Sequence, residues 1–303
     1  MRLSIPSSTS PARLLCWLFA FTLATGCQTR LAGQCTPVND YIEHIEIAKV
    51  RDTLIARLDE APGDNIEREQ VARKYFEHVC PGLQTYPIPG SQHRSYACRV
   101  KGHSTGKPGN GAANLNVVGA HYDKSPAGAG VADNWTGVVM TTALLEYFSE
   151  NQPSNTFEFV LFGEEEPGMK GSIAYLAAID HSVIQSMINI DTLGLGPMTI
   201  DTRSENRLEC LALGSARALS ITTRSMALRQ SIGDWKPFQR QGIPILNLHS
   251  LDETRLTMVH TWRDRRRSVD DRHVINAYRL ILNTLLAIER GNTSRGKNNP
   301  ATP

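Results

Sequence analysis

The sequence lacks any large excess of charge of one sign. Its 32 lysines and arginines are nearly balanced by 30 aspartates and glutamates, which gives a formal net charge of +2 at pH 7. Arg2 and Arg13 account for this excess, and both lie in a segment that we expect to be removed. Proteins that bind nucleic acid usually present a strongly basic face, so we expect no nucleic-acid partner.

The sequence also lacks an apolar run long enough to span a bilayer comfortably. The apolar residues 14–23, which follow Arg13, have the length of a signal-peptide core. We therefore predict export, with residues 1–26 as the signal peptide. Residues 23–27 resemble a bacterial lipoprotein box, which implies that Cys27 is acylated as the mature N-terminus; ordinary signal-peptidase cleavage is the alternative. Gln28 favours an outer-membrane lipoprotein in the periplasm or at the cell envelope.

Cysteines are scarce, and none are spaced like zinc ligands. Apart from Cys16 and Cys27, the sequence has only Cys35, Cys80, Cys98 and Cys210. No two of these four have zinc-ligand spacing, whereas an even number of cysteines in an exported chain favours disulfides. Four cysteines allow three connectivities, of which we favour Cys80 with Cys98 because they flank a short hairpin-like segment.

Strand-like and helix-like patterns alternate along the chain, which has an ordinary globular composition with 41% hydrophobic residues. Strands are predicted at residues 83–88, 96–100, 115–120, 157–162, 187–190 and 243–248, and helices at 42–58, 66–79, 138–148, 171–179, 207–219 and 271–288. This order predicts an α/β fold, a three-layer α/β/α arrangement with a mixed, mostly parallel central sheet. We expect a tether at 27–40, one catalytic domain with an N-terminal helical elaboration at 41–292, and a polar tail at 293–303.

Acidic and imidazole side chains follow several predicted strands. His121 ends the strand at 115–120, Glu164, Glu165 and Glu166 follow the strand at 157–162, and Asp191 follows the strand at 187–190. Ligands bind at the carboxyl ends of parallel strands. Nitrogen and carboxylate ligands together suit zinc, so the sequence predicts a zinc site at this edge of the sheet.

Five segments resemble zinc metallopeptidase family twenty-eight, which contains bacterial leucyl aminopeptidases, yeast aminopeptidase Y and the glutamate carboxypeptidases. The matching segments, spread over residues 114–288, are His121-Tyr122-Asp123, Asp133-Asn134-Trp135-Thr136-Gly137, Glu165-Glu166-Pro167-Gly168-Met169-Lys170-Gly171-Ser172, Asn189-Ile190-Asp191, and His260-Thr261 with Asp264. They occur in the family's order and approximate spacing. The resemblance implies a zinc-exopeptidase fold and a peptide substrate.

The resemblance also implies a site that holds two zinc ions. Asp133 matches the carboxylate that bridges the ions. Glu166 and His260 would bind one ion, and His121 and Asp191 would bind the other. Glu165 matches the general base, and Asp123 the residue that orients the imidazole of His121. A shifted register, with Glu164 as the base and Glu165 as the ligand, requires an insertion.

The sequence departs from the family near the expected substrate pocket. Trp235 stands where the family often has a histidine, and Trp262 follows His260-Thr261 where a proline is common. Trp235 and Trp262 are therefore candidates for substrate binding, and His249 is a third because it follows a predicted strand. We interpret the chain as an aminopeptidase, with two alternatives: a single-zinc glutaminyl cyclase on the same fold, or a non-catalytic, receptor-like binding module. The oligomeric state is not predicted.

Overall fold

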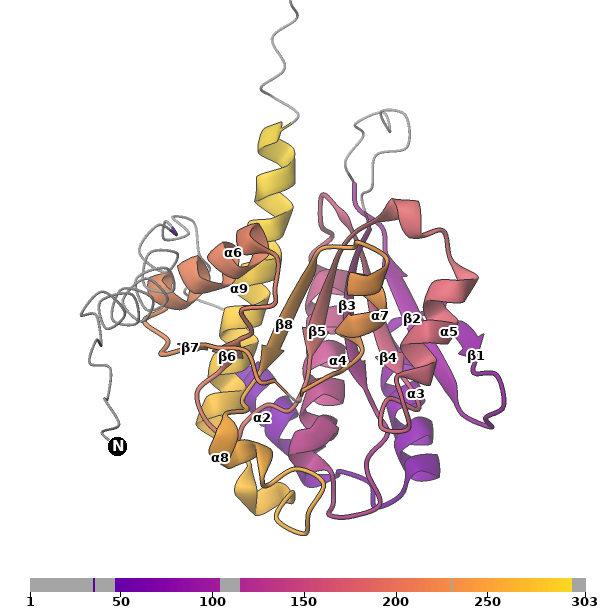
Figure 1. Ribbon diagram of the computed structural model, residues 1–303. Coiled ribbons are helices and arrows are strands. Elements are labelled where there is room, and N and C mark those ends of the chain that lie inside the picture. Colours follow the sequence, from indigo (N-terminus) through magenta and orange to yellow (C-terminus); the bar gives the residue numbers. More distant parts are fainter. Residues whose placement is uncertain (1–34, 36–46, 104–114, 230, 296–303) are drawn as a thin grey trace, which may run out of the picture. The chain divides into compact units, whose positions relative to one another are not determined.

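The computed structural model describes residues 35, 47–103, 115–229 and 231–295 (Figure 1). The chain divides into two units, residues 1–36 and residues 37–303, and every helix and strand given below lies in the second unit. The predicted signal peptide, its lipidation site Cys27 and most of the tether lie outside the described residues. Among the helices within the described ranges, none combines the length and apolar character needed to cross a membrane.

A mixed eight-stranded sheet forms the centre of the second unit. In space the strands run in the order β1 (Gln84–Pro87), β2 (Arg94–Val100), β4 (Thr156–Phe162), β3 (Leu115–His121), β5 (Ile184–Ile190), β8 (Ile245–His249), β6 (Thr199–Ile200) and β7 (Arg224–Ser225). The four central strands β4, β3, β5 and β8 are parallel, while β1 and β2 join one side as an antiparallel pair. The predicted mostly parallel sheet is confirmed.

Helices cover both faces of this sheet (Figure 1). The helices are α2 (Ile47–Asp59), α3 (Asn65–Val79), α4 (Thr136–Glu150), α5 (Lys170–Ala178), α6 (Asn206–Ala218), α7 (Trp235–Arg240), α8 (Glu253–Leu256) and α9 (Asp271–Arg295). On one face α4 packs on β3 and β4 and contacts α2, α3 and α9, while α5 and α7 lie on the opposite face. Helix α9 ends at Arg295, three residues into the segment predicted to be a polar tail.

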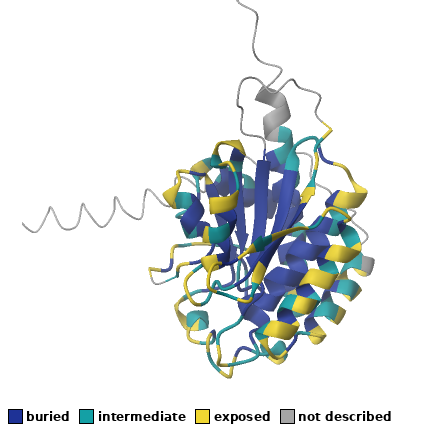
Figure 2. Cartoon of the chain, turned by 90° about the vertical axis from the view of Figure 1, so that its right-hand side faces the viewer, coloured by how far each residue is buried: buried dark blue, intermediate teal, exposed yellow. Residues whose placement is uncertain are grey.

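The central strands are buried along nearly their whole length because both of their faces are covered. Every residue of β3 is buried, and in Figure 2 the strands are dark blue while the outer faces of the helices are yellow. Against α4, the ring of Phe148 lies 4.8 Å from that of Phe157 and 5.8 Å from that of Phe159. Phe162, on the other side of the same strand, packs against Tyr175 of α5 and Phe238 of α7. Successive side chains of β4 point to opposite faces of the sheet, so this one strand contributes phenylalanine rings to the core on both sides.

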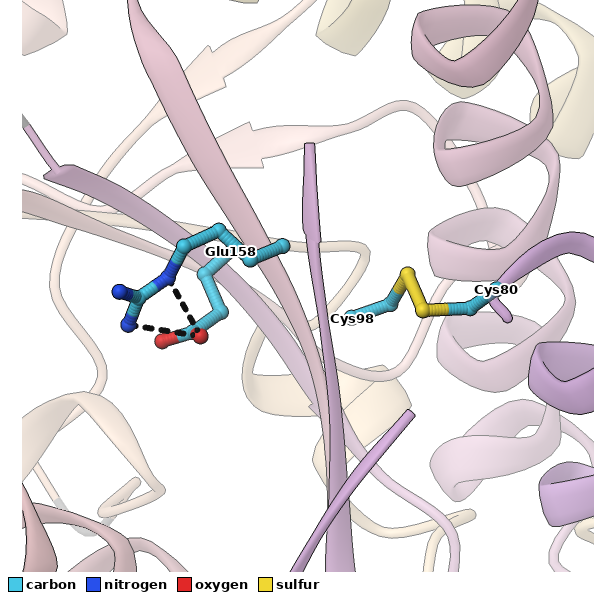
Figure 3. Close-up of a disulfide and its surroundings, with 4 residues drawn as sticks. Cys80, Cys98 and Glu158 are labelled. Atoms are coloured by element: carbon cyan, nitrogen blue, oxygen red, sulfur yellow. Dashed lines mark hydrogen bonds and ion pairs between the residues drawn. A yellow bond between two sulfur atoms is a disulfide. The ribbon is translucent and has the colours of Figure 1, made fainter. Parts of the chain in front are cut away.

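A buried carboxylate interrupts the apolar surface of β4. Glu158 is fully buried and accepts a hydrogen bond from Arg99 Nε at 2.9 Å and another from the hydroxyl of Tyr175. Figure 3 shows this carboxylate and the Cys80–Cys98 disulfide on opposite sides of β2. The partners of Glu158 satisfy its charge, as a buried ion requires.

The Cys80–Cys98 disulfide joins the end of α3 to β2. This pairing, chosen from the sequence, is confirmed, and Cys35 and Cys210 are disulfide-bonded as well. The bond fixes the C-terminal end of α3 to the second strand of the sheet. It thereby holds α3 beside the strands that carry the candidate site.

Candidate metal centre

The parallel strands deliver most of the candidate ligands to one edge of the sheet. His121 is the last residue of β3, Asp191 follows β5, and Glu165 and Glu166 follow β4. His260 does not directly follow a strand, because β8 ends at His249 and α8 intervenes. Its φ of 56° lies in the left-handed region, a costly conformation for a non-glycine residue that is frequent at functional sites.

Two groups of ligand atoms share Asp133. One group contains His121, Asp133 and Asp191, and the other contains Asp133, Glu166 and His260; within each group the ligand atoms lie within 4.8 Å of one another. Oδ1 of Asp133 lies 3.3 Å from His121 Nε2, and Oδ2 lies 3.1 Å from His260 Nε2. The carboxylate of Asp133 therefore presents one oxygen to each histidine.

The separations between ligand atoms fit a bound metal ion. His121 Nε2 lies 3.5 Å from Asp191 Oδ1, and His260 Nε2 lies 2.9 Å from Glu166 Oε2. Two ligands at about 2.1 Å from a tetrahedral zinc ion are about 3.4 Å apart. The second oxygen of Glu166 is buried and has no hydrogen-bond partner among the described residues. The residues present thus fit two zinc ions, with Asp133 as the ligand common to both.

Asn134 holds the two sides of the first group together. Its Nδ2 donates to the carbonyl of Ile190 at 2.9 Å, and its Oδ1 accepts from the main-chain N–H groups of Gly137 and Thr192. A Cβ at Gly137 would lie 2.4 Å from Asn134 Oδ1, so glycine is required there. Asn134, which follows Asp133, is therefore hydrogen-bonded to the main chain of both neighbours of Asp191, Ile190 and Thr192.

The carboxylate of Asp123 lies within ion-pair distance of His121 and also contacts the glutamates. Nδ1 of His121 lies 3.0 Å from the main-chain oxygen of Asp123 but 3.7 Å from its carboxylate Oδ1, which is longer than a hydrogen bond. The carboxylate instead accepts from the main-chain N–H groups of Glu165 and Glu166. Asp123 therefore contacts the imidazole through its main-chain carbonyl, while its carboxylate holds the main chain of both glutamates and remains within ion-pair distance of His121.

The three consecutive glutamates have different surroundings. Glu164 accepts hydrogen bonds from Ser91 Oγ at 2.7 Å and Lys170 Nζ at 2.9 Å. Oε2 of Glu165 lies 4.0 Å from His121 Nε2, and Glu165 belongs to neither ligand group. The carboxylate of Glu164 is thus hydrogen-bonded to residues that are not candidate ligands. This favours the sequence register in which Glu165 is the base beside the metal centre and Glu166 is a ligand.

Burial and neighbouring charges shift the pKa values of the site residues. Hydrogen bonds to Asp133 and Glu166 raise the pKa of His260 to about 10. Burial opposes the charged form of His121, but the nearby carboxylates outweigh it and raise its pKa well above the ordinary value. Burial also raises the pKa of Glu165 well above its usual range, although His121 partly offsets the rise. A carboxylate with a raised pKa is a better proton acceptor near neutral pH.

The structure places two of the three predicted substrate-binding residues in the interior. Trp235 is 2% exposed and belongs to the core cluster that includes Phe162 and Phe238. His249 is also buried, with Nδ1 accepting from the N–H of Leu251 at 3.0 Å. Trp262 is 65% exposed and stays a candidate.

Three residues near the centre had no role assigned from the sequence. Asp264 accepts from the N–H groups of Ala132 and Asp133, Asp234 is buried nearby, and Arg68 of α3 donates to main-chain carbonyls beside the site. Asp264 and Asp234 stand within segments compared with the family. Arg68 could have been noticed as a charged residue on the buried face that Ala72 and Phe76 share with it.

Comparisons with known proteins decide the family. A model of peptidase family M28 matches residues 103–285, more than half of the chain. The chain belongs to peptidase family M28. This confirms the resemblance drawn from the five segments.

The vacuolar membrane protease of Kluyveromyces lactis is 35% identical over 98 residues, which are 32% of this chain and 10% of that protein. The M28 chain therefore spans about a tenth of this curated relative.

Solved structures share the fold of this M28 peptidase. The LapA aminopeptidase of Legionella pneumophila has a TM-score of 0.69 at 14% identity, covering 84% of this chain and 78% of that one. A glutaminyl cyclase from an Acidobacteriales bacterium has a TM-score of 0.67 at 15% identity, covering 85% of this chain and 99% of that one. At these identities the likeness shows the zinc-exopeptidase fold and leaves the reaction to be argued from the site.

Asp234 provides a test of the electrostatics of the metal-free site. Its carboxylate oxygens are buried with no hydrogen-bond partner among the described residues, and burial raises the pKa of Asp234 to about 7. Folding favours the protonated form of Asp234, so this group stabilises the folded protein fully below the pKa of an unfolded aspartate, about 3.9. That contribution to the free energy of unfolding is lost as the pH rises through 7. Relative to Asp234→Asn, the wild type should lose about 1.4 kcal/mol of unfolding free energy per pH unit between these limits.

Urea unfolding in the presence of a chelator at pH 5, 6 and 7 measures this difference. Asp52→Asn is the control for removing one carboxylate, since the side chain of Asp52 is 70% exposed. A difference in unfolding free energy between wild type and Asp234→Asn that stays constant from pH 5 to pH 7 would contradict the raised pKa of Asp234.

Proposed function

We propose that this M28 peptidase is a di-zinc aminopeptidase that hydrolyses the N-terminal peptide bond of peptides. One observation carries the proposal: Asp133 presents an oxygen to each of two histidine–carboxylate groups, and Glu165 lies beside them as a member of neither. A pair of metal sites with a separate carboxylate is the arrangement needed for metal-assisted hydrolysis.

Zinc fits the donors better than other common cations. The five ligands are two imidazoles and three carboxylates, a set that suits zinc, whereas magnesium and calcium prefer oxygen ligands alone. His121, Asp191 and Asp133 would hold one ion, and His260, Glu166 and Asp133 the other. When bound, the two ions would polarise the substrate carbonyl and lower the pKa of the attacking water.

Glu165 would transfer the proton. Its side chain is only 12% exposed, and its raised pKa matches a base that must accept and release a proton near neutral pH. It would take the proton from the attacking water and pass it to the leaving amine. The carboxylate of Asp123 supports this role because it accepts hydrogen bonds from the main-chain N–H groups of both Glu165 and Glu166. These bonds fix the main-chain positions from which the base and the ligand extend.

Two other functions are weighed against hydrolysis. A glutaminyl cyclase is favoured by the likeness of the fold to a cyclase that the chain covers almost completely. That reaction would use a single zinc, whereas this chain has a complete set of ligands for two. A non-catalytic binding module would need neither the base nor both ligand groups, and the chain has all of them.

We also propose that the enzyme acts outside the cytoplasm. The Cys80–Cys98 disulfide supports an oxidising compartment, where such bonds persist. The predicted signal peptide and Cys27 would export the chain and attach it by a lipid to the bacterial outer membrane.

Replacing Glu165 by glutamine should abolish turnover while leaving the ligands intact. The amide cannot accept the proton, so kcat should fall about 100- to 10,000-fold, with unchanged zinc content and circular dichroism. Glu164→Gln is the matched control, because Glu164 is engaged by Ser91 and Lys170, and it should keep kcat within about threefold. The reverse pattern would place the base at Glu164.

A substrate panel separates the three functions. Purified protein with measured zinc content should be incubated with free and N-acetylated aminoacyl substrates and with a glutaminyl peptide, after chelation and after zinc addition. We expect zinc-restored hydrolysis of the free-amine substrates and no cyclised product. Cyclisation without hydrolysis would replace the proposal with the cyclase, and the absence of both would support a binding module.

A further inference from the structure

Arg68 is a fully buried arginine that lies outside the segment matched by the family model. It belongs to α3, in the N-terminal helical elaboration. Its guanidinium donates four hydrogen bonds, all to main-chain carbonyls: Nε to Pro62 at 3.2 Å, Nη1 to Tyr122 at 3.0 Å, and Nη2 to Ala129 at 2.7 Å and Gly130 at 2.6 Å.

Three of these carbonyls belong to the two segments that carry metal ligands. Tyr122 directly follows His121, while Ala129 and Gly130 come just before Asp133. One planar guanidinium therefore joins the end of β3 to the loop that delivers the shared carboxylate. Because its donors have fixed directions, an arginine sets the separation and orientation of the groups that it binds.

The loop is shaped around this guanidinium. Gly130 has a φ of 60°, and a Cβ there would lie 3.1 Å from Arg68 Nη2 and 2.5 Å from the Cβ of Lys124. On the other side of the loop, Asp264 accepts from the N–H groups of Ala132 and Asp133. The carbonyls of the loop are thus bound by a cation and its amides by an anion.

Arg68 stays charged although it forms no ion pair among the described residues. Burial lowers the pKa of Arg68 to about 10, so it remains protonated at neutral pH. The guanidinium carbon lies 5.3 Å from the ring centre of Trp135, which adds a cation–π contact. A buried charge is costly unless the protein solvates it well. Four carbonyls and one aromatic face supply that solvation for the guanidinium of Arg68.

We propose that Arg68 is a positioning residue for the metal centre, holding His121 and Asp133 at the separation at which they bind one ion. Two effects of the guanidinium on zinc affinity oppose each other. Its charge repels a cation and lowers affinity, whereas its hydrogen bonds keep two ligands in place and raise affinity. The inference is that positioning outweighs repulsion, and it rests on the proposed metal centre but not on the choice of substrate.

Two substitutions separate the geometry from the charge. Arg68→Met removes both the charge and the hydrogen bonds. Arg68→Lys keeps the charge, but a single ammonium group cannot reproduce the planar fork that binds carbonyls from two segments. If positioning dominates, both variants bind zinc about 10- to 100-fold more weakly than wild type, the usual cost of losing a partner that orients metal ligands.

The experiment measures zinc affinity by equilibrium competition with a coloured chelator, on protein shown by circular dichroism to be folded. Arg57→Met is the matched control, because the guanidinium of Arg57 on α2 pairs with Glu146 and lies over Tyr75. Its contact with the segment of the centre is made by its main-chain carbonyl, which accepts from Trp135 Nε1 and is kept in the variant. It should change melting temperature but leave zinc affinity within about twofold of wild type.

Each outcome decides between the possibilities. Weaker zinc binding by both Arg68 variants, with the control unchanged, supports the positioning role. Unchanged or tighter binding by Arg68→Met would overturn it, and tighter binding would show that charge repulsion dominates. If Arg68→Met does not fold, Arg68→Lys alone decides, since unchanged affinity in that variant contradicts the role of the fork. A wild-type chain that binds no zinc would instead reject the metal centre itself.

Discussion

The crowding of carboxylates at one buried edge of the sheet is the constraint on which the rest of the structure depends. Like charges held together in a site of low dielectric repel strongly unless they are compensated. Here compensation comes from several directions. Asp133 faces His121 and His260, Asp123 and Asp264 accept from main-chain N–H groups, and the charge of Arg68 lies nearby. The arrangement is that of a site built to hold cations, and Asp133, which faces both imidazoles, is its central residue.

Much of this could be predicted from the sequence because the signals were local. A continuous apolar run followed by His121, Glu165–Glu166 or Asp191 indicates a buried parallel strand that ends in a polar group. Such strands bring their carboxyl ends together without further information. The disulfide was predictable for a similar reason, since Cys80 and Cys98 flank a short segment at the edge of the sheet.

What the sequence did not reveal depends on tertiary packing. Trp235 occupies a position near the expected pocket, yet its ring faces the core beside Phe238, and nothing in its local pattern separates these two directions. The main-chain oxygen of Asp123 lies closer to the imidazole of His121 than its carboxylate does, which depends on the turn after β3. Arg68 is 54 to 62 residues from the carbonyls that it binds at the metal centre, so no spacing rule could connect them. A scaffold shared by aminopeptidases and a cyclase likewise leaves the reaction to the details of the site.

The most direct test of this account is anomalous diffraction at the zinc edge from crystals of the zinc-loaded protein. The account predicts two peaks about 3.5–4 Å apart, one bound by His121 and Asp191, the other by Glu166 and His260, with Asp133 bound to both and Glu165 to neither. A single peak, or two peaks that do not share Asp133, would contradict it.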